Sequence, residues 1–220
     1  MKKEYIEFLQ KKQTSIESSG FDLMDSEMNE KLFPFQKYCV KRAVKAGRFA
    51  MFEDCGLGKT LQQLEWAYQV QKHINQPVLI LAPLGVIGQT IQEGVKFGYE
   101  VKEIGLTVFD QDLKAGIYIT NYDNMDNIDS YLFGGVVLDE SSILKNFNGK
   151  IRNELIASFK ETKYKLCCTA TPSPNDTTEL CNHAEFLNVM SRNEMLAMYF
   201  VHDGGSTSDW RLKGHAKQAF

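Results

Sequence analysis

The sequence contains 220 residues, of which 43% are hydrophobic and 24% are charged, and its formal net charge is −3. This length allows one full hydrophobic core, and no apolar run approaches the roughly 20 residues that a membrane span requires. The first residues lack the apolar core of a secretory signal, so we expect a cytoplasmic protein without a membrane partner. The net charge gives no sign of nucleic-acid binding, and any such contact would have to come from local patches.

The cysteines are odd in number and include no C-x-x-C pair, which suits a reducing compartment better than a disulfide framework. Cys181 and His183 lie close together in the sequence, and His202 and His215 follow further on. Zinc ligation usually requires tighter and repeated spacing, so we expect packing and surface roles for these side chains. The cysteines are Cys39, Cys55, Cys167, Cys168 and Cys181.

Residues 1–30 differ in pattern from the rest of the chain. Scattered apolar residues such as Ile6 and Leu9, followed by Ser18, Ser19 and Gly20, predict a short helix and a linker. From residue 32 onward, short apolar runs alternate with longer amphipathic stretches, which is typical of a parallel sheet with crossover helices. We therefore expect an N-terminal extension over 1–30 and an α/β domain over 31–220.

The predicted strands are short and apolar or β-branched, and all but the first are near-continuous, as strands covered on both faces should be. They are Phe49–Phe52, Val78–Ala82, Ile117–Thr120, Val136–Leu138 and Lys165–Thr169. Lys59–Ile74 and Gly88–Phe97 are predicted to be helices. The first is better supported, because several of its apolar residues fall on one face. That face is formed by Leu61, Leu64, Ala67 and Tyr68.

The segment EDCGLGKT, residues 53–60, lies between a predicted strand and a predicted helix. Its glycines let the backbone curl and point N–H groups at phosphate oxygens, and the helix adds its positive N-terminal end. We expect Lys59 to reach the β and γ phosphates of ATP and Thr60 to offer its hydroxyl to Mg²⁺. Glu53 stands where the strict P-loop pattern has glycine. In this context a nucleotide-binding loop is favoured over a chance glycine turn, with contacts from Cys55, Gly56, Leu57, Gly58, Lys59, Thr60 and Leu61.

An acidic pair follows a second predicted strand, in the segment GGVVLDESS. Asp139 and Glu140 should emerge at the carboxyl end of that buried strand, which is the edge where α/β sheets bind ligands. We expect Asp139 to hold Mg²⁺ and Glu140 to orient and deprotonate the attacking water. Alone, the segment could equally be a solvated strand end. Together with Lys59 and its loop, it supplies the other half of a Mg-nucleotide site.

Several segments, taken in order, resemble the Swi/Snf branch of the superfamily-two motors. LFPFQKYCVKRAV (32–44) is similar to the glutamine motif of those motors, and DESSILKN (139–146) runs into a Lys-Asn pair that the branch tends to keep. TATPSPNDTTELCNHAEFL (169–187) is the closest match. LILAPLGVIGQTIQE (79–93) and IYITNYDNM (117–125) are similar to two segments that touch a DNA strand. The resemblance covers roughly residues 32–190 and suggests a phage or bacterial version of the family.

This resemblance implies a RecA-like P-loop NTPase domain, with a parallel sheet flanked by helices, that acts as the first lobe of an ATP-dependent DNA translocase. It implies that Gln36 reads adenine, and that ATP, Mg²⁺ and duplex DNA are bound. The residues that couple the nucleotide to the DNA would be Thr169, Ala170 and Thr171. The nucleic-acid contacts would come from Pro83, Leu84, Gly85, Asn121, Tyr122 and Lys145.

The sequence departs from the family pattern in two ways. Ser141 and Ser142 stand where many relatives carry Ala-His, so the link from nucleotide to coupling motif is expected to differ in detail. Motors of this family also close a second RecA-like lobe over ATP, and that lobe supplies an arginine worth about 10³ to 10⁵ in rate. The sequence leaves no room for this lobe, so we expect it in a longer chain or a partner protein.

Other functions remain open at this point. A non-catalytic, ATP-dependent nucleic-acid-binding or scaffold module would explain the absent lobe, although such a module does not need a water-activating Glu140. An RNA-directed relative is also possible, and our preference for duplex DNA is an analogy to the Swi/Snf branch. A small-molecule P-loop kinase is disfavoured by the match over residues 169–187.

Overall fold

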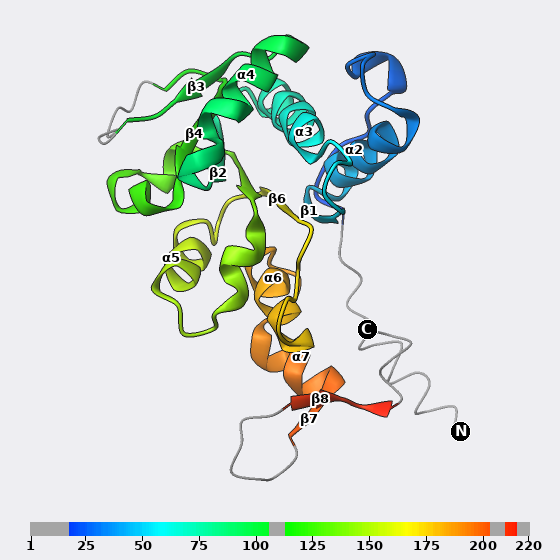
Figure 1. Ribbon diagram of the computed structural model, residues 1–220, viewed down its shortest axis with the longest axis vertical. Helices are drawn as coiled ribbons and strands as arrows, with labels where there is room; N and C mark the ends of the chain where they lie inside the picture. Colours follow the sequence, from blue (N-terminus) through cyan, green and yellow to red (C-terminus); the bar gives the residue numbers. More distant parts are fainter. Residues whose placement is uncertain (1–17, 106–112, 203–209, 215–220) are drawn as a thin grey trace.

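A six-stranded parallel sheet forms the centre of the computed structural model, which describes residues 18–105, 113–202 and 210–214 (Figure 1). The strand order is β1-β6-β5-β2-β4-β3, and every neighbouring pair is parallel. The strands are β1 (Arg48–Phe52), β2 (Val78–Ala82), β3 (Val101–Glu103), β4 (Ile117–Asn121), β5 (Gly135–Asp139) and β6 (Tyr164–Thr169). Because all strands are parallel, their carboxyl ends meet at one edge of the sheet.

Helices cover both faces of this sheet. They are α2 (Pro34–Ala46), α3 (Lys59–Ile74), α4 (Ile87–Phe97), α5 (Lys150–Ser158) and α6 (Leu180–Phe186), while α7 (Arg192–Tyr199) packs against α6. Side chains alternate along each strand, so Ile80 packs in one core cluster with residues of α2 and α3, whereas Leu79 and Leu81 pack in another with residues of α5 and α6. Figure 1 shows α2, α3 and α4 on one side of the sheet and α5 and α6 on the other. The predicted α/β architecture is confirmed.

The five predicted strands and two predicted helices are present, with ends that differ by at most one residue. Strand β3 was not predicted, because it is three residues long and two of them are exposed and charged. The antiparallel pair β7 (Phe200–His202) and β8 (Trp210–Leu212) was also missed. Helices α2, α5, α6 and α7 were not predicted as elements either, and the last three are nine residues or shorter.

Of the four apolar residues placed on one face of α3 by their spacing, Tyr68 is 37% exposed and the other three are buried. Helix α3 is not a simple amphipathic surface helix. It contacts α2, α4 and four strands of the sheet, so polar positions are buried along with apolar ones. The buried residues are Leu61, Gln62, Gln63, Leu64, Glu65, Trp66, Ala67, Gln69 and Val70.

The predicted N-terminal helix around Ile6 and Leu9 lies outside the described residues. The predicted linker closes the carboxyl end of α2, because the backbone N–H groups of Ser19, Gly20 and Phe21 donate to carbonyl groups of residues 44–46. A Cβ at Gly20 would lie 1.7 Å from a carbonyl oxygen of α2. Glycine is therefore required where this segment approaches the helix.

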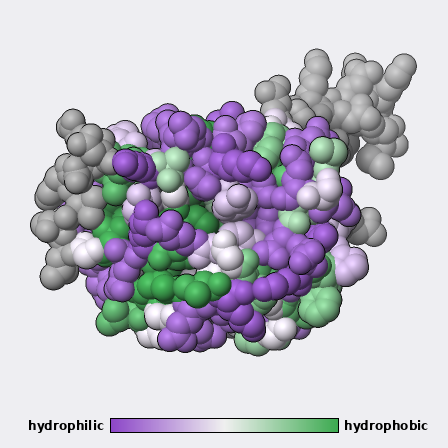
Figure 2. Space-filling view, turned by 90° about the horizontal axis from the view of Figure 1, so that it is seen from above, coloured by the Kyte–Doolittle hydropathy of each residue, from purple (hydrophilic) through white to green (hydrophobic). Residues whose placement is uncertain are grey.

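The face of the molecule seen from the top of Figure 1 is mostly hydrophilic, with smaller hydrophobic areas between the polar residues (Figure 2). Among the helices of the described ranges, none has the length and apolar character that a membrane crossing would need.

Candidate functional site

The loop between β1 and α3 has the backbone geometry that phosphate binding requires. Gly56 and Gly58 adopt φ angles of 83° and 75°, in the left-handed region that favours glycine. Gly58 is the residue immediately before α3, so the loop leads directly into a helix N-terminus. A Cβ at Gly58 would lie 2.5 Å from Nε2 of Gln36. The two glycines thus permit a tight loop whose N–H groups gather at the positive end of a helix.

Lys59 lies across this loop. Its Nζ donates to the carbonyl oxygens of Glu53 at 2.9 Å and Asp54 at 3.0 Å. Glu53, the residue in place of the expected glycine, accepts a hydrogen bond from Gln62 Nε2 at 2.6 Å. Glu53 therefore ties the start of the loop to α3. The Lys59 ammonium group is held by backbone oxygens of the loop, which a phosphate could replace.

Gln36 is buried against the same loop. Its Oε1 accepts from the N–H of Phe33 at 2.9 Å, and its Nε2 donates to the carbonyl of Leu57 at 2.8 Å. Gln36 thus joins the start of α2 to the loop, and its role in reading adenine stays a prediction.

A cavity of about 410 Å³ opens beside Gln36. Phe33 and Phe35 line it with nearly parallel rings, 6.3 Å apart, and both are exposed. Aromatic faces of this kind can stack on a nucleotide base. These two aromatics were missed in the sequence, although their position on either side of Pro34, just before Gln36, was the available signal. The lining residues are Lys31, Phe33, Phe35, Gln36, Gly56, Leu57, Gly58, Leu61, Glu93, Lys96 and Phe97.

Asp139 lies at the carboxyl end of β5, two strands away from the loop. Gln63 of α3 donates to its Oδ1 at 2.7 Å, and the Tyr122 hydroxyl donates to its carbonyl oxygen at 2.7 Å. Burial raises the pKa of Asp139, and the hydrogen bond from Gln63 opposes that rise. Helix α3 therefore connects the loop to the acidic pair. Gln63 was missed because an amide inside a helix gives no sequence signal of its own.

Thr60 and the acidic pair supply hydroxyl and carboxylate oxygens, which are donors of the kind that Mg²⁺ prefers. Thr60 lies in the first turn of α3, and Asp139 is joined to α3 through Gln63. The buried Oε1 atoms of Gln62 and Gln63 have no hydrogen-bond partner among the described residues. A buried amide oxygen next to the Asp139 carboxylate, as in Gln63, adds a further oxygen donor, so the residues present suit the metal that the family implies.

Glu140 adopts a left-handed backbone conformation, with φ 57°, at the turn after β5. Its Oε1 accepts from the hydroxyl groups of Thr169 at 2.6 Å and Ser142 at 2.7 Å. Thr169 Oγ1 in turn accepts from the backbone N–H of Thr171 at 3.0 Å, with Ala170 between them. The candidate base and the predicted coupling segment are therefore in direct contact.

A groove of about 630 Å³ runs along the same edge from Glu140; we call it the carboxyl-edge groove. All the predicted nucleic-acid residues except Gly85 line this groove. Gly85 lies in the adjacent turn Leu84–Val86. Tyr122 is buried, and its hydroxyl is already bonded to Asp139. The lining residues are Pro83, Leu84, Asn121, Tyr122, Asp123, Glu140, Ser142, Ile143, Lys145, Asn146, Gly149, Lys150, Ile151 and Arg152.

The cations of this groove differ in their partners. Lys150 pairs with Asp126 and Glu154, and Arg152 pairs with Glu185. Within the described ranges, Lys145 takes part in no ion pair and is exposed. Lys145 is therefore the groove cation that an anionic ligand can reach without breaking an existing pair.

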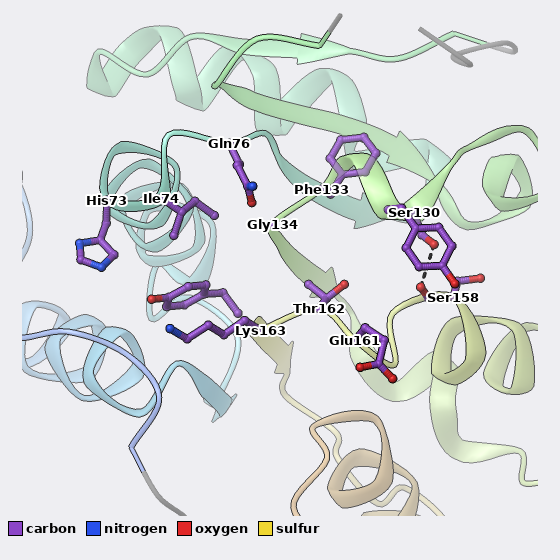
Figure 3. A pocket seen from close by; sticks show the side chains of 12 residues that line it. His73, Ile74, Gln76, Ser130, Phe133, Gly134, Ser158, Glu161, Thr162 and Lys163 are labelled. Carbon is purple, nitrogen blue, oxygen red and sulfur yellow. Dashed lines mark hydrogen bonds between the residues drawn. The ribbon is translucent and has the colours of Figure 1, made fainter. Parts of the chain in front are cut away.

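A second hollow, of about 330 Å³, lies at the opposite edge of the sheet, and we call it the amino-edge hollow (Figure 3). It surrounds residues that precede β2, β5 and β6, together with the end of α3. None of the predicted site residues lines it. Its lining residues are His73, Ile74, Gln76, Ser130, Tyr131, Phe133, Gly134, Ser158, Glu161, Thr162, Lys163 and Tyr164.

Cys181 and His183 are both buried in α6. Across the described part of the chain, no three histidine, cysteine or acidic side chains are grouped so that they could hold a metal ion. Burial lowers the pKa of His183 to about 4, so its imidazole is neutral at pH 7.

The parallel sheet, the glycine loop that opens α3 and the acidic pair after β5 define a RecA-like ATPase core. The chain belongs to the SNF2-related domain family, whose model matches residues 35–199.

Curated relatives include the SWI/SNF-related matrix-associated actin-dependent regulator of chromatin subfamily A-like protein 1 of Xenopus tropicalis. It is 27% identical over 165 residues, which cover 71% of this chain and 17% of the relative. Putative protein p41 of Acyrthosiphon pisum secondary endosymbiont phage 1 is 28% identical over 178 residues, covering 70% of this chain and 38% of that protein. The chain thus spans well under half the length of these relatives.

Solved structures share the fold. The Sulfolobus solfataricus SWI2/SNF2 ATPase core in complex with dsDNA matches with a TM-score of 0.67 and 24% identity, covering 81% of this chain and 41% of that one. The UvsW helicase from bacteriophage T4 matches with a TM-score of 0.61 and 15% identity, covering 78% and 67%.

Proposed function

We propose that residues 31–220 form the first motor lobe of an ATP-dependent DNA translocase, which binds ATP with Mg²⁺ at the carboxyl edge of the sheet and duplex DNA in the carboxyl-edge groove. One observation carries the proposal. The Lys59 loop, the acidic pair and the Thr169 segment lie at one edge and are joined by hydrogen bonds through Gln62, Gln63 and Glu140.

Nucleotide binding would begin with an exchange of partners at Lys59. Its ammonium group would leave the carbonyl oxygens of Glu53 and Asp54 for the phosphates, where charge makes the hydrogen bonds stronger. Gln36 would recognise the adenine edge, and Phe33 and Phe35 would stack on the ring. Thr60 and Asp139 would hold the metal, which when bound neutralises charge on the phosphates.

Hydrolysis requires a base for the attacking water, and Glu140 would accept its proton while the bond between the β and γ phosphates breaks to give ADP and phosphate. Glu140 Oε1 is engaged by Thr169 and Ser142. Two hydroxyl donors occupy this oxygen, so we infer that release of the Thr169 and Ser142 hydrogen bonds controls when it can accept a proton from water. The bond from Thr169 also explains how residues 169–171 would sense the nucleotide.

Duplex DNA would lie against the turns that carry Leu84 and Asn121, with Lys145 facing a phosphate. The support is the lining of the groove, which includes both Glu140 and Lys145, a cation with no ion pair within the described part of the chain. A second lobe, in a longer chain or a partner, would supply the arginine that full turnover needs.

The test is the release of phosphate from Mg-ATP by the 220-residue chain, alone and with duplex DNA, with Glu140→Gln as the blank. We expect release that rises with DNA and falls about 10²- to 10⁴-fold in the variant, the range for loss of a general base. A single-stranded RNA of equal length serves as the comparison ligand, and stimulation by RNA alone would overturn the assignment of DNA.

A non-catalytic ATP-dependent DNA-binding or scaffold module is the second candidate. Equal phosphate release by the wild-type chain and Glu140→Gln, with ATP and DNA both bound, would favour it over the catalytic proposal. The contacts of Glu140 argue against it, because a module that only binds nucleotide has no need to hold this carboxylate beside Thr169.

A further inference from the structure

The 3₁₀ segment η5 (Ser141–Lys145) follows Glu140 directly and is held at both ends by two residues of α6. At its start, Ser141 Oγ and His183 Nε2 lie 3.1 Å apart, within hydrogen-bond distance. At its end, Asn182 Nδ2 donates to the carbonyl oxygens of Leu144 at 2.8 Å and Lys145 at 3.2 Å. The whole segment is therefore attached to one helix through one pair of adjacent side chains.

These attachments are buried and polar. Ser141, Asn182 and His183 have 0%, 1% and 2% of their surface exposed. Within the described structure, His183 Nδ1 and Asn182 Oδ1 have no hydrogen-bond partner. Burying polar groups with unmet capacity opposes folding, and apolar residues of similar shape often pack as well. Stability alone therefore does not account for this pair.

The two ends of η5 face different parts of the molecule. Its first end carries Glu140 and Ser142, whose side chains are bonded to each other beside Thr169. Its second end carries Lys145, in the carboxyl-edge groove. A five-residue segment fixed at both ends transmits a shift of one end to the other, because few of its dihedral angles are free to absorb the change.

His183 also touches the strand that leads into the phosphate loop. The ring of Phe52, at the end of β1, meets the imidazole edge-on with centroids 5.2 Å apart. Glu53, the next residue, begins the Lys59 loop. Ser141 places a hydroxyl where His183 can reach it.

We propose that Asn182 and His183 are positioning residues that couple duplex DNA in the carboxyl-edge groove to the nucleotide site through η5. The inference rests on the proposed function, since it concerns how the two ligands of that site affect each other. Neither residue need touch ATP or DNA. Their effect would be on the mutual influence of the two ligands rather than on the affinity of either one alone.

The experiment measures the dissociation constant of a fluorescent ATP analogue with Mg²⁺, with and without saturating duplex DNA, for the whole chain. The ratio of the two constants is the coupling factor, which typically lies between about 5 and 150 when sites are coupled. This readout requires no turnover, so it is independent of any second lobe.

The test variant is Ser141→Ala/His183→Leu, which replaces both members of the buried pair with apolar groups and so limits the loss of stability. The matched control is Ser130→Ala/His73→Leu, which makes the same two replacements in the amino-edge hollow. Asn182→Leu tests the other end of η5. Thermal melting establishes that each variant is folded under the conditions of the titration.

We expect the test variant and Asn182→Leu to bind the analogue as tightly as the wild-type chain without DNA, but with a coupling factor near one. Faster hydrogen exchange of amides 141–146 should accompany this loss. The control should keep the wild-type factor. A folded test variant with the full factor would overturn the inference, as would a wild-type factor of one. A wild-type chain that binds neither ligand would instead overturn the proposed function, and the inference with it.

Discussion

The two edges of the central sheet differ in what their polar side chains bond to. At the carboxyl edge, Lys59 donates to backbone carbonyl groups, but side chains from different elements also bond to one another, as in Gln63 with Asp139 and Thr169 with Glu140. At the amino edge, the Ser130 hydroxyl donates to the backbone carbonyl of Ser158 at 2.7 Å and so fixes a turn. Bonds between side chains can be exchanged for a ligand without opening the backbone. The pattern of partners, more than the presence of a hollow, therefore separates the candidate site from the amino-edge hollow.

The largest difference between the two edges is expected in how lysine substitutions affect the affinity for an ATP analogue. Lys59→Ala removes the cation of the loop and is expected to weaken binding of an ATP analogue by more than about 10²-fold, at least about 3 kcal/mol. Lys163→Ala, in the amino-edge hollow, should leave binding unchanged. Fluorescence titration measures both affinities, and circular dichroism establishes the fold. Equal effects of the two variants would erase the proposed difference between the edges.

Acid should lower the free energy of unfolding through His183, which packs at the carboxyl edge. Its pKa is lowered to about 4 in the folded chain from an ordinary value of 6.5. Between these two pKa values the unfolded state binds a proton that the folded state does not. The free energy of unfolding is therefore highest above pH 6.5 and falls by about 3 kcal/mol as the pH drops to 4.

Urea unfolding of the wild-type chain and of Ser141→Ala/His183→Leu across this range measures that dependence. The variant lacks the histidine, so its curve should be flatter by the same amount. Two parallel curves would show that His183 does not titrate as its burial predicts.

Gln63→Leu removes the amide that orients Asp139 from within α3. Loss of a residue that supports a metal ligand costs on the order of tenfold or more in metal affinity. We expect the Mg²⁺ concentration that gives half-maximal binding of the ATP analogue to rise by about that factor, with little change in thermal stability. An unchanged Mg²⁺ requirement would mean that Asp139 is positioned by the strand alone.

Ser130→Ala should have the smallest effect and only on stability. It removes the hydroxyl that donates to Ser158 and is expected to cost about 1 kcal/mol of unfolding free energy. Nucleotide affinity should stay the same. Weaker ATP binding in this variant would show that the amino edge communicates with the site.

Much of this arrangement could be predicted from the sequence, because the strands are continuous apolar runs and the glycine loop and acidic pair each follow one of them. Chain order therefore predicted which residues meet at the carboxyl edge. The contact between Glu140 and Thr169 is seen in the structure and was not predicted, and the roles of both residues remain predictions.

Other features gave no local signal. Gln63 and His183 are polar residues inside helices, and their partners lie 76 and 42 positions away. Helix α3 is buried on several sides, so its pattern of apolar residues could not indicate that Tyr68 is exposed. Such contacts depend on how helices pack against the sheet, which periodicity within one segment does not specify.

The central claim is that nucleotide binds at the carboxyl edge, and a crystal structure of the chain grown with a non-hydrolysable ATP analogue and Mg²⁺ tests it most directly. We predict phosphate density on residues 56–60, a cation between Thr60 and Asp139, and Lys59 turned from its own loop to the phosphates. Nucleotide density in the amino-edge hollow, or phosphates bound away from Lys59, would contradict the account.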